Sequence, residues 1–255
     1  MTGVALISHG SVAEIRLENP DKLNAFTQAM LRTLEARCAA LEQDRGVRAV
    51  VLSAAPARAF CAGADIFEWG AMGPADFARH WVREGHRIFD RLARLSKPTV
   101  AALHAHAFGG GLELASCCDI RVMAPRATLA LPEAQVGIVP GWSGTQRTAR
   151  LLGESVIKEM ALFGRRITAD RALSLGFAAE IAEDTHAAAM ALAEGAAALS
   201  PRATEIAKAQ IHAGVGEDPA AMIEALGSAA VGASADRAEG VDAFANKRKP
   251  TFTGE

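Results

Sequence analysis

Two glutamates are the residues of this chain best suited to carry chemistry. Glu113 follows the three glycines at 109–111, and Glu133 follows a proline at the end of an apolar stretch. Two neighbouring carboxyl groups can act as a general acid and a general base. Glycines that lead into a helix leave backbone N–H groups free to stabilise negative charge on a carbonyl oxygen. The pattern therefore indicates a site that polarises a carbonyl group and moves protons beside it.

Each of these features also has a purely structural explanation. A carboxylate such as Glu113 in the first turn of a helix offsets the helix dipole. Three glycines can form a flexible turn, but their entropic cost favours a specific backbone requirement. The small residues at 59–66 would let a ligand lie against the backbone, although a tight connection between two elements has the same composition.

The sequence does not favour a metal site or a nucleophilic triad. His104 and His106 alternate along an expected strand, but no third ligand has suitable spacing, so we expect no metal. We find no P-loop, no G-x-S-x-G elbow and no Ser/His/Asp order. The cysteines lack zinc-site spacing and are interpreted as reduced thiols of the core. They are Cys38, Cys61, Cys117 and Cys118.

The elements that must position the glutamates alternate between strands and helices over the first 150 residues. β-prone pieces at 4–7 and 12–17 enclose a turn and predict a hairpin. An apolar stripe with helical spacing follows at Leu31, Leu34, Cys38 and Leu41. Further strands are expected at 49–52, 99–103, 120–123 and 128–131, and further helices at 111–118 and 145–152. This alternation indicates an α/β fold.

After about residue 153 the strand signals end and helical signals dominate. Thr168 is expected to cap a helix that Gly176 ends. Further helices are expected at 187–199, 203–212, 218–230 and 236–246. We therefore predict a core over 1–195 and a helical region over 196–255. Such small-residue helices pack either on another subunit or within the chain.

Composition limits the classes of protein that fit. The chain has 255 residues, half of them apolar, and a formal net charge of −2. It can bury a sizeable core, and it lacks the clustered basic face of nucleic-acid or membrane-surface proteins. It also lacks a targeting segment and the run of about 18 apolar residues that spans a membrane. We expect a soluble, cytoplasmic protein without nucleic-acid or membrane partners.

Five segments together resemble the crotonase family, the enoyl-CoA hydratase/isomerase superfamily. They lie at 19–26, 61–66, 109–114, 132–147 and 239–250, in the family's order and nearly from end to end. The resemblance implies a spiral of ββα repeats with a helical C-terminal trimerisation region. It also implies a homotrimer or a dimer of trimers that acts on acyl-CoA. Coenzyme A is then part of the substrate, and no separate cofactor is expected.

The resemblance assigns a role to each site residue. The N–H groups of Ala64 and Gly110 form the oxyanion hole around the thioester oxygen. Glu113 acts as the base on a water that adds at C3, and Glu133 gives a proton to C2, a role that a burial-raised pKa suits. The expected substrate and CoA contacts are Lys22, Ala25, Ala62, Asp65, Ile66, Gly141, Phe244 and Lys247.

Two positions depart from the pattern of the family. Phe67 stands where many hydratases have a lysine, so Lys22 or Lys247, the latter from a neighbouring subunit, is left to contact the CoA phosphates. Trp142 and Ser143 replace a common Ala-Gly pair, and Trp142 either narrows the acyl pocket or packs outward.

The aromatics of the variable segment 68–86 could line the same pocket. They are Trp69, Phe77 and Trp81. These side chains would either line the acyl pocket for bulky acyl chains or form the buried face of an amphipathic helix. We favour the second arrangement, which is packing in the core. The length and branching of the acyl group stay open.

Three other functions compete with a hydratase. A double-bond isomerase or another acyl-CoA lyase could use the same two glutamates, and only product analysis separates these enzymes. An RNA-binding protein would show salt-dependent binding without turnover. A purely structural trimer would bind no acyl-CoA.

Overall fold

The computed structural model describes residues 3–255, which form two compact units. The first unit ends at Thr204, and the second runs from Glu205 to Glu255. The division into a core over 1–195 and an oligomerisation region over 196–255 stays a prediction, because the compactness of the two units does not test a role in oligomerisation. No helix within the described residues is long and apolar enough to cross a membrane.

A six-stranded sheet forms the centre of the first unit. Its strands, in spatial order, are β1 (Gly3–His9), β2 (Val12–Glu18), β3 (Ala49–Ala54), β5 (Thr99–Leu103), β7 (Ile120–Met123) and β10 (Glu180–Ile181). The predicted hairpin is confirmed, since β1 pairs antiparallel with β2, and all other neighbours are parallel. Every residue of β3 and β5 is buried, as expected for parallel strands covered on both faces.

A four-stranded sheet accompanies it. Its strands, in spatial order, are β4 (Ala59–Cys61), β6 (His106–Phe108), β8 (Thr128–Ala130) and β9 (Ile167–Thr168). From β3 to β8, successive strands along the chain alternate between the two sheets, so β3-β4, β5-β6 and β7-β8 are repeated units of the spiral fold.

The expectation that strands end near residue 153 is wrong. Both β9 and β10 follow that point, and each has only two residues. Strands this short show no periodicity of their own. They form because β8 and β7 offer them an edge to pair with.

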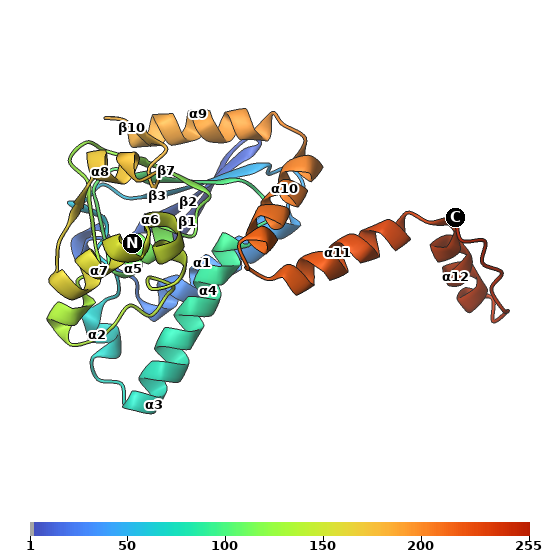
Figure 1. The fold of residues 1–255 in the computed structure, drawn as a ribbon, viewed down its shortest axis with the longest axis horizontal. Coiled ribbons are helices and arrows are strands. Elements are labelled where there is room, and N and C mark those ends of the chain that lie inside the picture. Colours follow the sequence, from blue (N-terminus) through green and yellow to red (C-terminus); the bar gives the residue numbers. More distant parts are fainter. Residues whose placement is uncertain (1–2) are drawn as a thin grey trace. The chain divides into compact units, whose positions relative to one another are not determined.

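Helices cover the six-stranded sheet. In α1 (Gln28–Gln43) the predicted apolar stripe is buried, and the Thr27 side chain caps the helix by accepting from the Met30 N–H. In α9 (Thr185–Ala197) Ala189, Ala193 and Ala197 are buried against β2, β3, β5 and β7. Figure 1 shows α9 running along that face of the sheet. The small residues of this helix therefore pack within the chain.

Shorter helices connect the strands of the first unit. They are α2 (Ile66–Trp69), α3 (Pro74–Asp76), α4 (Glu84–Ala93), α5 (Gly110–Ala115), α6 (Arg147–Leu152), α7 (Glu154–Phe163) and α8 (Ala169–Ser174). A π-helical turn spans Phe77–Arg83, and 3₁₀ turns span Pro20–Lys22 and Glu133–Val136. The predicted caps of α8 are confirmed, because Thr168 accepts from the Arg171 N–H and Gly176 has a φ of +76°.

Buried thiols and the buried carboxylate of Glu14 also belong to the core of this unit. All four cysteines are buried and free, as predicted for core thiols. The Glu14 carboxylate on β2 accepts from Ser53 on β3 and contacts His9 and His186. These contacts hold its pKa below its ordinary value although burial opposes them.

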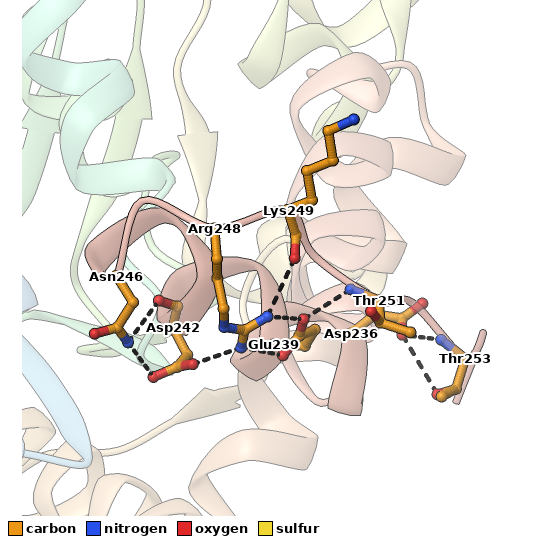
Figure 2. A network of polar contacts seen from close by, with 8 residues as sticks. All are labelled: Asp236, Glu239, Asp242, Asn246, Arg248, Lys249, Thr251 and Thr253. Carbon is orange, nitrogen blue, oxygen red and sulfur yellow. Dashed lines mark hydrogen bonds and ion pairs between the residues drawn. The ribbon is translucent and has the colours of Figure 1, made fainter.

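The second unit is helical, as predicted. The helix α10 (Pro201–Gly214) crosses the division, followed by α11 (Pro219–Gly232) and α12 (Ala235–Ala245). Figure 2 shows how the C-terminal tail folds back on α12. Arg248 pairs with Glu239 and Asp242 at 2.6 Å each, and the Thr251 N–H donates to Glu239 at 2.7 Å. These charged contacts are exposed and give the tail a defined path rather than large stability.

Candidate active site

Close packing explains the three glycines before α5. A Cβ on Gly111 would lie 2.1 Å from the carbonyl oxygen of Cys61 on β4, so only glycine lets the helix approach this strand. Gly109 has a φ of +52°, and a Cβ there would lie 3.0 Å from Oε1 of Glu133. The run of glycines is therefore a requirement of the fold at this point and not a loose turn.

The same approach brings two backbone donors together. Gly63 has a φ of +105°, and a Cβ there would lie 3.3 Å from the Gly110 nitrogen. Hydrogen bonds of 2.8 Å between Phe26 and its partners Gly63 and Asp65 fix the turn that contains Ala64. Within residues 3–255 the N–H groups of Ala64 and Gly110 donate to no protein acceptor. Both residues line one cavity, where these donors are available to a ligand.

This cavity has a volume of about 300 Å³ and is mostly apolar. Among residues 3–255, Glu113 and Glu133 are the only ones that bring a carboxyl group to its lining. An apolar pocket with a few converging polar groups is the usual form of a site for a small molecule.

Glu113 is almost completely buried and held by backbone donors. It lies in the first turn of α5, as predicted. Its Oε1 accepts from the N–H groups of Trp142 at 2.8 Å and Gly144 at 2.7 Å. Burial, and then the nearby charge of Glu133, raise the pKa of Glu113 to about 7, although the two backbone donors oppose this shift. These donors stabilise the ionised carboxylate, which is the form that can act as a base.

Glu133 differs from Glu113 in its hydrogen bonds. It begins the 3₁₀ turn after β8 and is also buried. Burial raises the pKa of Glu133 to about 7, and its Oε2 has no hydrogen-bond partner among the described residues. A buried carboxyl group without external donors favours the protonated form, which can act as an acid.

The structure divides the expected substrate and CoA contacts by their position relative to the cavity. Ala62, Ile66 and Gly141 line the cavity together with the glutamates. Ala25 is buried and precedes Phe26 in the sequence, but it does not line the cavity.

Lys22, Asp65 and Phe67 form a cluster on the surface. The Asp65 carboxylate caps α2 by accepting from the Phe67 N–H at 3.1 Å, and Lys22 Nζ lies 3.8 Å from the same carboxylate. Lys22 Nζ also lies 4.7 Å from the centre of the exposed Phe67 ring. Phe67 thus holds the lysine through a cation–π contact. Lys22 thus supplies a cation beside the residues that line the cavity, whereas position 67 is a phenylalanine.

Phe244 and Lys247 belong to the second unit. Phe244 lies on α12 with 88% of its surface exposed, and Lys247 follows this helix with a φ of +52°. The structure does not place either residue relative to the cavity, so their role in binding CoA stays a prediction.

The aromatic residues of 68–86 pack in or against the core, as favoured from the sequence, and they also line the cavity. Trp69 and Phe77 are partly buried and lie in its wall, while Trp81 lies in the wall and is buried in the core as well. Trp142 packs inward, since it too is buried and lines the cavity. The π-helical turn over Phe77–Arg83, a feature often found at functional sites, had no signal in the sequence.

Sequence reasoning missed the backbone donors of Trp142 and Gly144. Side-chain types carry no sign of such donors, because any residue except proline supplies an N–H. The turn signals around Ser143 marked the place, and Ser143 indeed has a φ of +86° between the two donors. Val82, Ile138 and Val139 also line the cavity and were missed, since they read as ordinary apolar residues.

Comparison with known proteins gives consistent similarity over the whole chain. The family model described as enoyl-CoA hydratase/isomerase matches residues 8–255. A probable enoyl-CoA hydratase 2, mitochondrial, from Arabidopsis thaliana is 36% identical over 251 residues, covering 97% of this chain and 83% of that protein. The short-chain-enoyl-CoA hydratase of Clostridium acetobutylicum is 32% identical, covering 98% and 97%. The crystal structure of enoyl-CoA hydratase from Bacillus anthracis has a TM-score of 0.81 at 33% identity and covers 99% of each chain.

Proposed function

The chain belongs to the enoyl-CoA hydratase/isomerase family, and from this premise we propose that it is an enoyl-CoA hydratase. It adds water across the 2,3 double bond of a 2-enoyl-CoA thioester to give a 3-hydroxyacyl-CoA. The observation that carries this proposal is the contrast between the two carboxyl groups of one cavity. Two backbone donors stabilise the ionised form of Glu113, whereas Glu133 has an unpaired, buried oxygen.

The backbone donors of Ala64 and Gly110 act on the thioester. Addition of water at C3 moves negative charge onto the thioester oxygen, and an N–H donor becomes stronger as this charge grows. Each such donor contributes about 3–4 kcal/mol to the transition state in comparable sites. The packing of α5 on β4 fixes the Gly110 donor, and the pairing of its turn with Phe26 fixes the Ala64 donor, so neither needs to rearrange during the reaction.

The two glutamates move the protons. Glu113, ionised, accepts a proton from a water held between the carboxyl groups, and the water oxygen bonds to C3. Glu133, protonated, then gives its proton to C2 and becomes ionised. The water thus supplies one hydroxyl group and one proton in total, and proton exchange with solvent restores the starting state.

Isomerisation of the double bond is the second candidate, since the same two carboxyl groups can move a proton along the acyl chain and the family includes isomerases. Incubation with crotonyl-CoA in H₂¹⁸O, followed by mass spectrometry, separates the two. Hydration incorporates ¹⁸O at C3, whereas isomerisation leaves the mass unchanged. A product without the label would contradict the hydratase assignment.

The pH dependence of hydration follows from the same pair. We expect kcat/KM to be bell-shaped with a maximum near pH 7, because Glu113 must be ionised, Glu133 must be protonated and each pKa is about 7. The two apparent values belong to the coupled pair rather than to either residue. Stopped-flow rates across acidic and alkaline buffers test this, and a rate that does not change with pH would contradict it.

We also propose that the protein forms a homotrimer or a dimer of trimers and acts in the cytoplasm. The exposed apolar residues of the second unit support an assembly, among them Phe244 and Val241 on α12 and Ile223 on α11. In such an assembly Phe244 and Lys247 would contact CoA. Coenzyme A enters as part of the substrate, and we propose no separate cofactor.

A further inference from the structure

The residues that line the cavity differ in exposure, and this difference distinguishes a buried inner end from an exposed outer end. Trp81 and Trp142 are each only 3% exposed and pack on the core, whereas Ile66 is 48% and Val139 is 78% exposed. The two tryptophans therefore form the inner wall, and Ile66 and Val139 lie at the mouth. The buried side of the cavity is therefore aromatic.

Aromatic packing and one hydrogen bond fix Trp142 in place. Its ring lies 5.0 Å from that of Phe89, 5.4 Å from Trp81 and 6.2 Å from Phe26, measured between centroids. Its Nε1–H donates to the carbonyl oxygen of Trp81, at 3.2 Å, on the π-helical turn. A buried indole whose N–H already donates a hydrogen bond is expected to keep a single rotamer.

Two glycines make room for this indole. A Cβ on Gly85 of α4 would lie 2.1 Å from Nε1 of Trp142, and a Cβ on Gly110 would lie 2.9 Å from its Cζ3. The indole thus fills space that side chains on two helices would otherwise occupy. It is held between the backbones of α4 and α5, so it cannot move aside to admit a longer chain. The indole is therefore a fixed part of the cavity lining and does not open.

The size of the cavity agrees with a closed inner end. Its volume of about 300 Å³ is at the low end of the usual range for small-molecule sites. Part of this volume must hold the thioester beside Gly110 and the reacting carbons beside the glutamates. We propose that Trp142 ends the acyl pocket and restricts the enzyme to short 2-enoyl thioesters. This specificity rests on the proposed hydratase function.

The variant Trp142→Leu tests this proposal through the ratio of rates on chains of different length. We expect the wild type to hydrate crotonyl-CoA with a kcat/KM at least about 100-fold above that for 2-decenoyl-CoA, as a methylene-sized clash gives roughly 10–200-fold discrimination. In Trp142→Leu the same ratio falls to about 10-fold or less, because the added space accepts the chain. The ratio is measured within one protein, so a lower folded fraction does not change it.

Phe177→Leu is the matched control. Phe177 is fully buried in the same core, against Arg121, and does not line the cavity. This variant also loses aromatic packing, but its crotonyl to decenoyl ratio should equal that of the wild type. A wild type that hydrates both substrates equally well, or a Trp142→Leu variant with an unchanged ratio, would overturn the proposal.

Binding of saturated thioesters tests the pocket without turnover. Each further buried methylene raises affinity about fourfold. By calorimetry, the affinity of the wild type should stop rising after the first few methylenes beyond butyryl-CoA, whereas that of Trp142→Leu keeps rising. If no enoyl-CoA is hydrated but the affinities follow this pattern, the proposed hydratase function is refuted, whereas the proposal that Trp142 limits the depth of the pocket is supported. If both proteins gain affinity alike up to decanoyl-CoA, the role of Trp142 is refuted.

Discussion

Replacement of Glu133 by glutamine is expected to lower kcat for hydration of crotonyl-CoA by about 10²–10⁴-fold, the usual contribution of general acid catalysis. Glutamine has nearly the same shape and still fits against Gly109, but it cannot give up a proton at neutral pH. Because the N–H donors of Ala64 and Gly110 stay in place, binding of the thioester should change little. Steady-state kinetics should therefore show the loss in kcat and only a small change in KM.

The same variant should be more stable than the wild type at alkaline pH. Burial raises the pKa of Glu133 from 4.5 to about 7, so the folded state holds this proton more tightly than the unfolded state. The free energy of unfolding of the wild type therefore falls as pH rises from about 4.5 to about 7. Glutamine does not ionise, so the variant keeps this part of its free energy of unfolding. The loss in the wild type is roughly 3 kcal/mol at most. Thermal unfolding at several pH values measures it.

Glu154→Gln is the control for both effects. Glu154 is an exposed carboxylate on α7 and does not line the cavity. Its replacement should change neither kcat nor the fall in stability between about pH 4.5 and 7, because the contact with Lys158 lowers the pKa of Glu154 rather than raising it. A Glu133→Gln variant with the kcat of the wild type would remove Glu133 from the proposed mechanism.

Replacement of Gly111 by alanine is expected to lower the free energy of unfolding by about 3 kcal/mol or more. The added methyl group would lie 2.1 Å from the Cys61 carbonyl oxygen, and neither α5 nor β4 can yield without moving backbone. In a protein of this size such a loss lowers the unfolding temperature by roughly 6–12 °C. Activity should fall as well, because the shift of α5 displaces the Gly110 donor and Glu113. Circular dichroism melts and hydration rates measure the two effects.

Gly195→Ala is the matched control for this substitution. Gly195 lies in α9, and a Cβ there would meet no atom within 4 Å. The same chemical change should raise stability by about 0.5–1 kcal/mol, since alanine favours helix more than glycine does. If Gly111→Ala melts at the temperature of the wild type, the close packing of α5 on β4 is not what fixes the Gly110 donor.

The sequence predicted the parts of this fold that have local signals. The stripe from Leu31 to Leu41 repeats with helical spacing and is buried in α1 as expected. The apolar runs of β3 and β5 are buried on both faces and stand out in the sequence for the same reason. The strands β4, β6, β9 and β10 have two or three residues each and exist through pairing with partners elsewhere in the chain.

The site could be predicted as a set of residues but not as a geometry. Residue types and their similarity to a known family pointed to Glu113 and Glu133, and the structure brings both to one cavity. The difference between them depends on the N–H donors of Trp142 and Gly144, which no side-chain pattern reveals. The inward position of Trp142 depends on glycines far apart in sequence, so sequence alone left it open.

The most direct test of the central claim follows the absorbance of the conjugated thioester of crotonyl-CoA with three proteins side by side. These are the wild type, Glu113→Gln and Glu133→Gln. If the two carboxyl groups add water as base and acid, the wild type removes the absorbance and each variant does so at least about 100-fold more slowly. A wild type that leaves the absorbance unchanged, or variants as fast as the wild type, would contradict this account of the site.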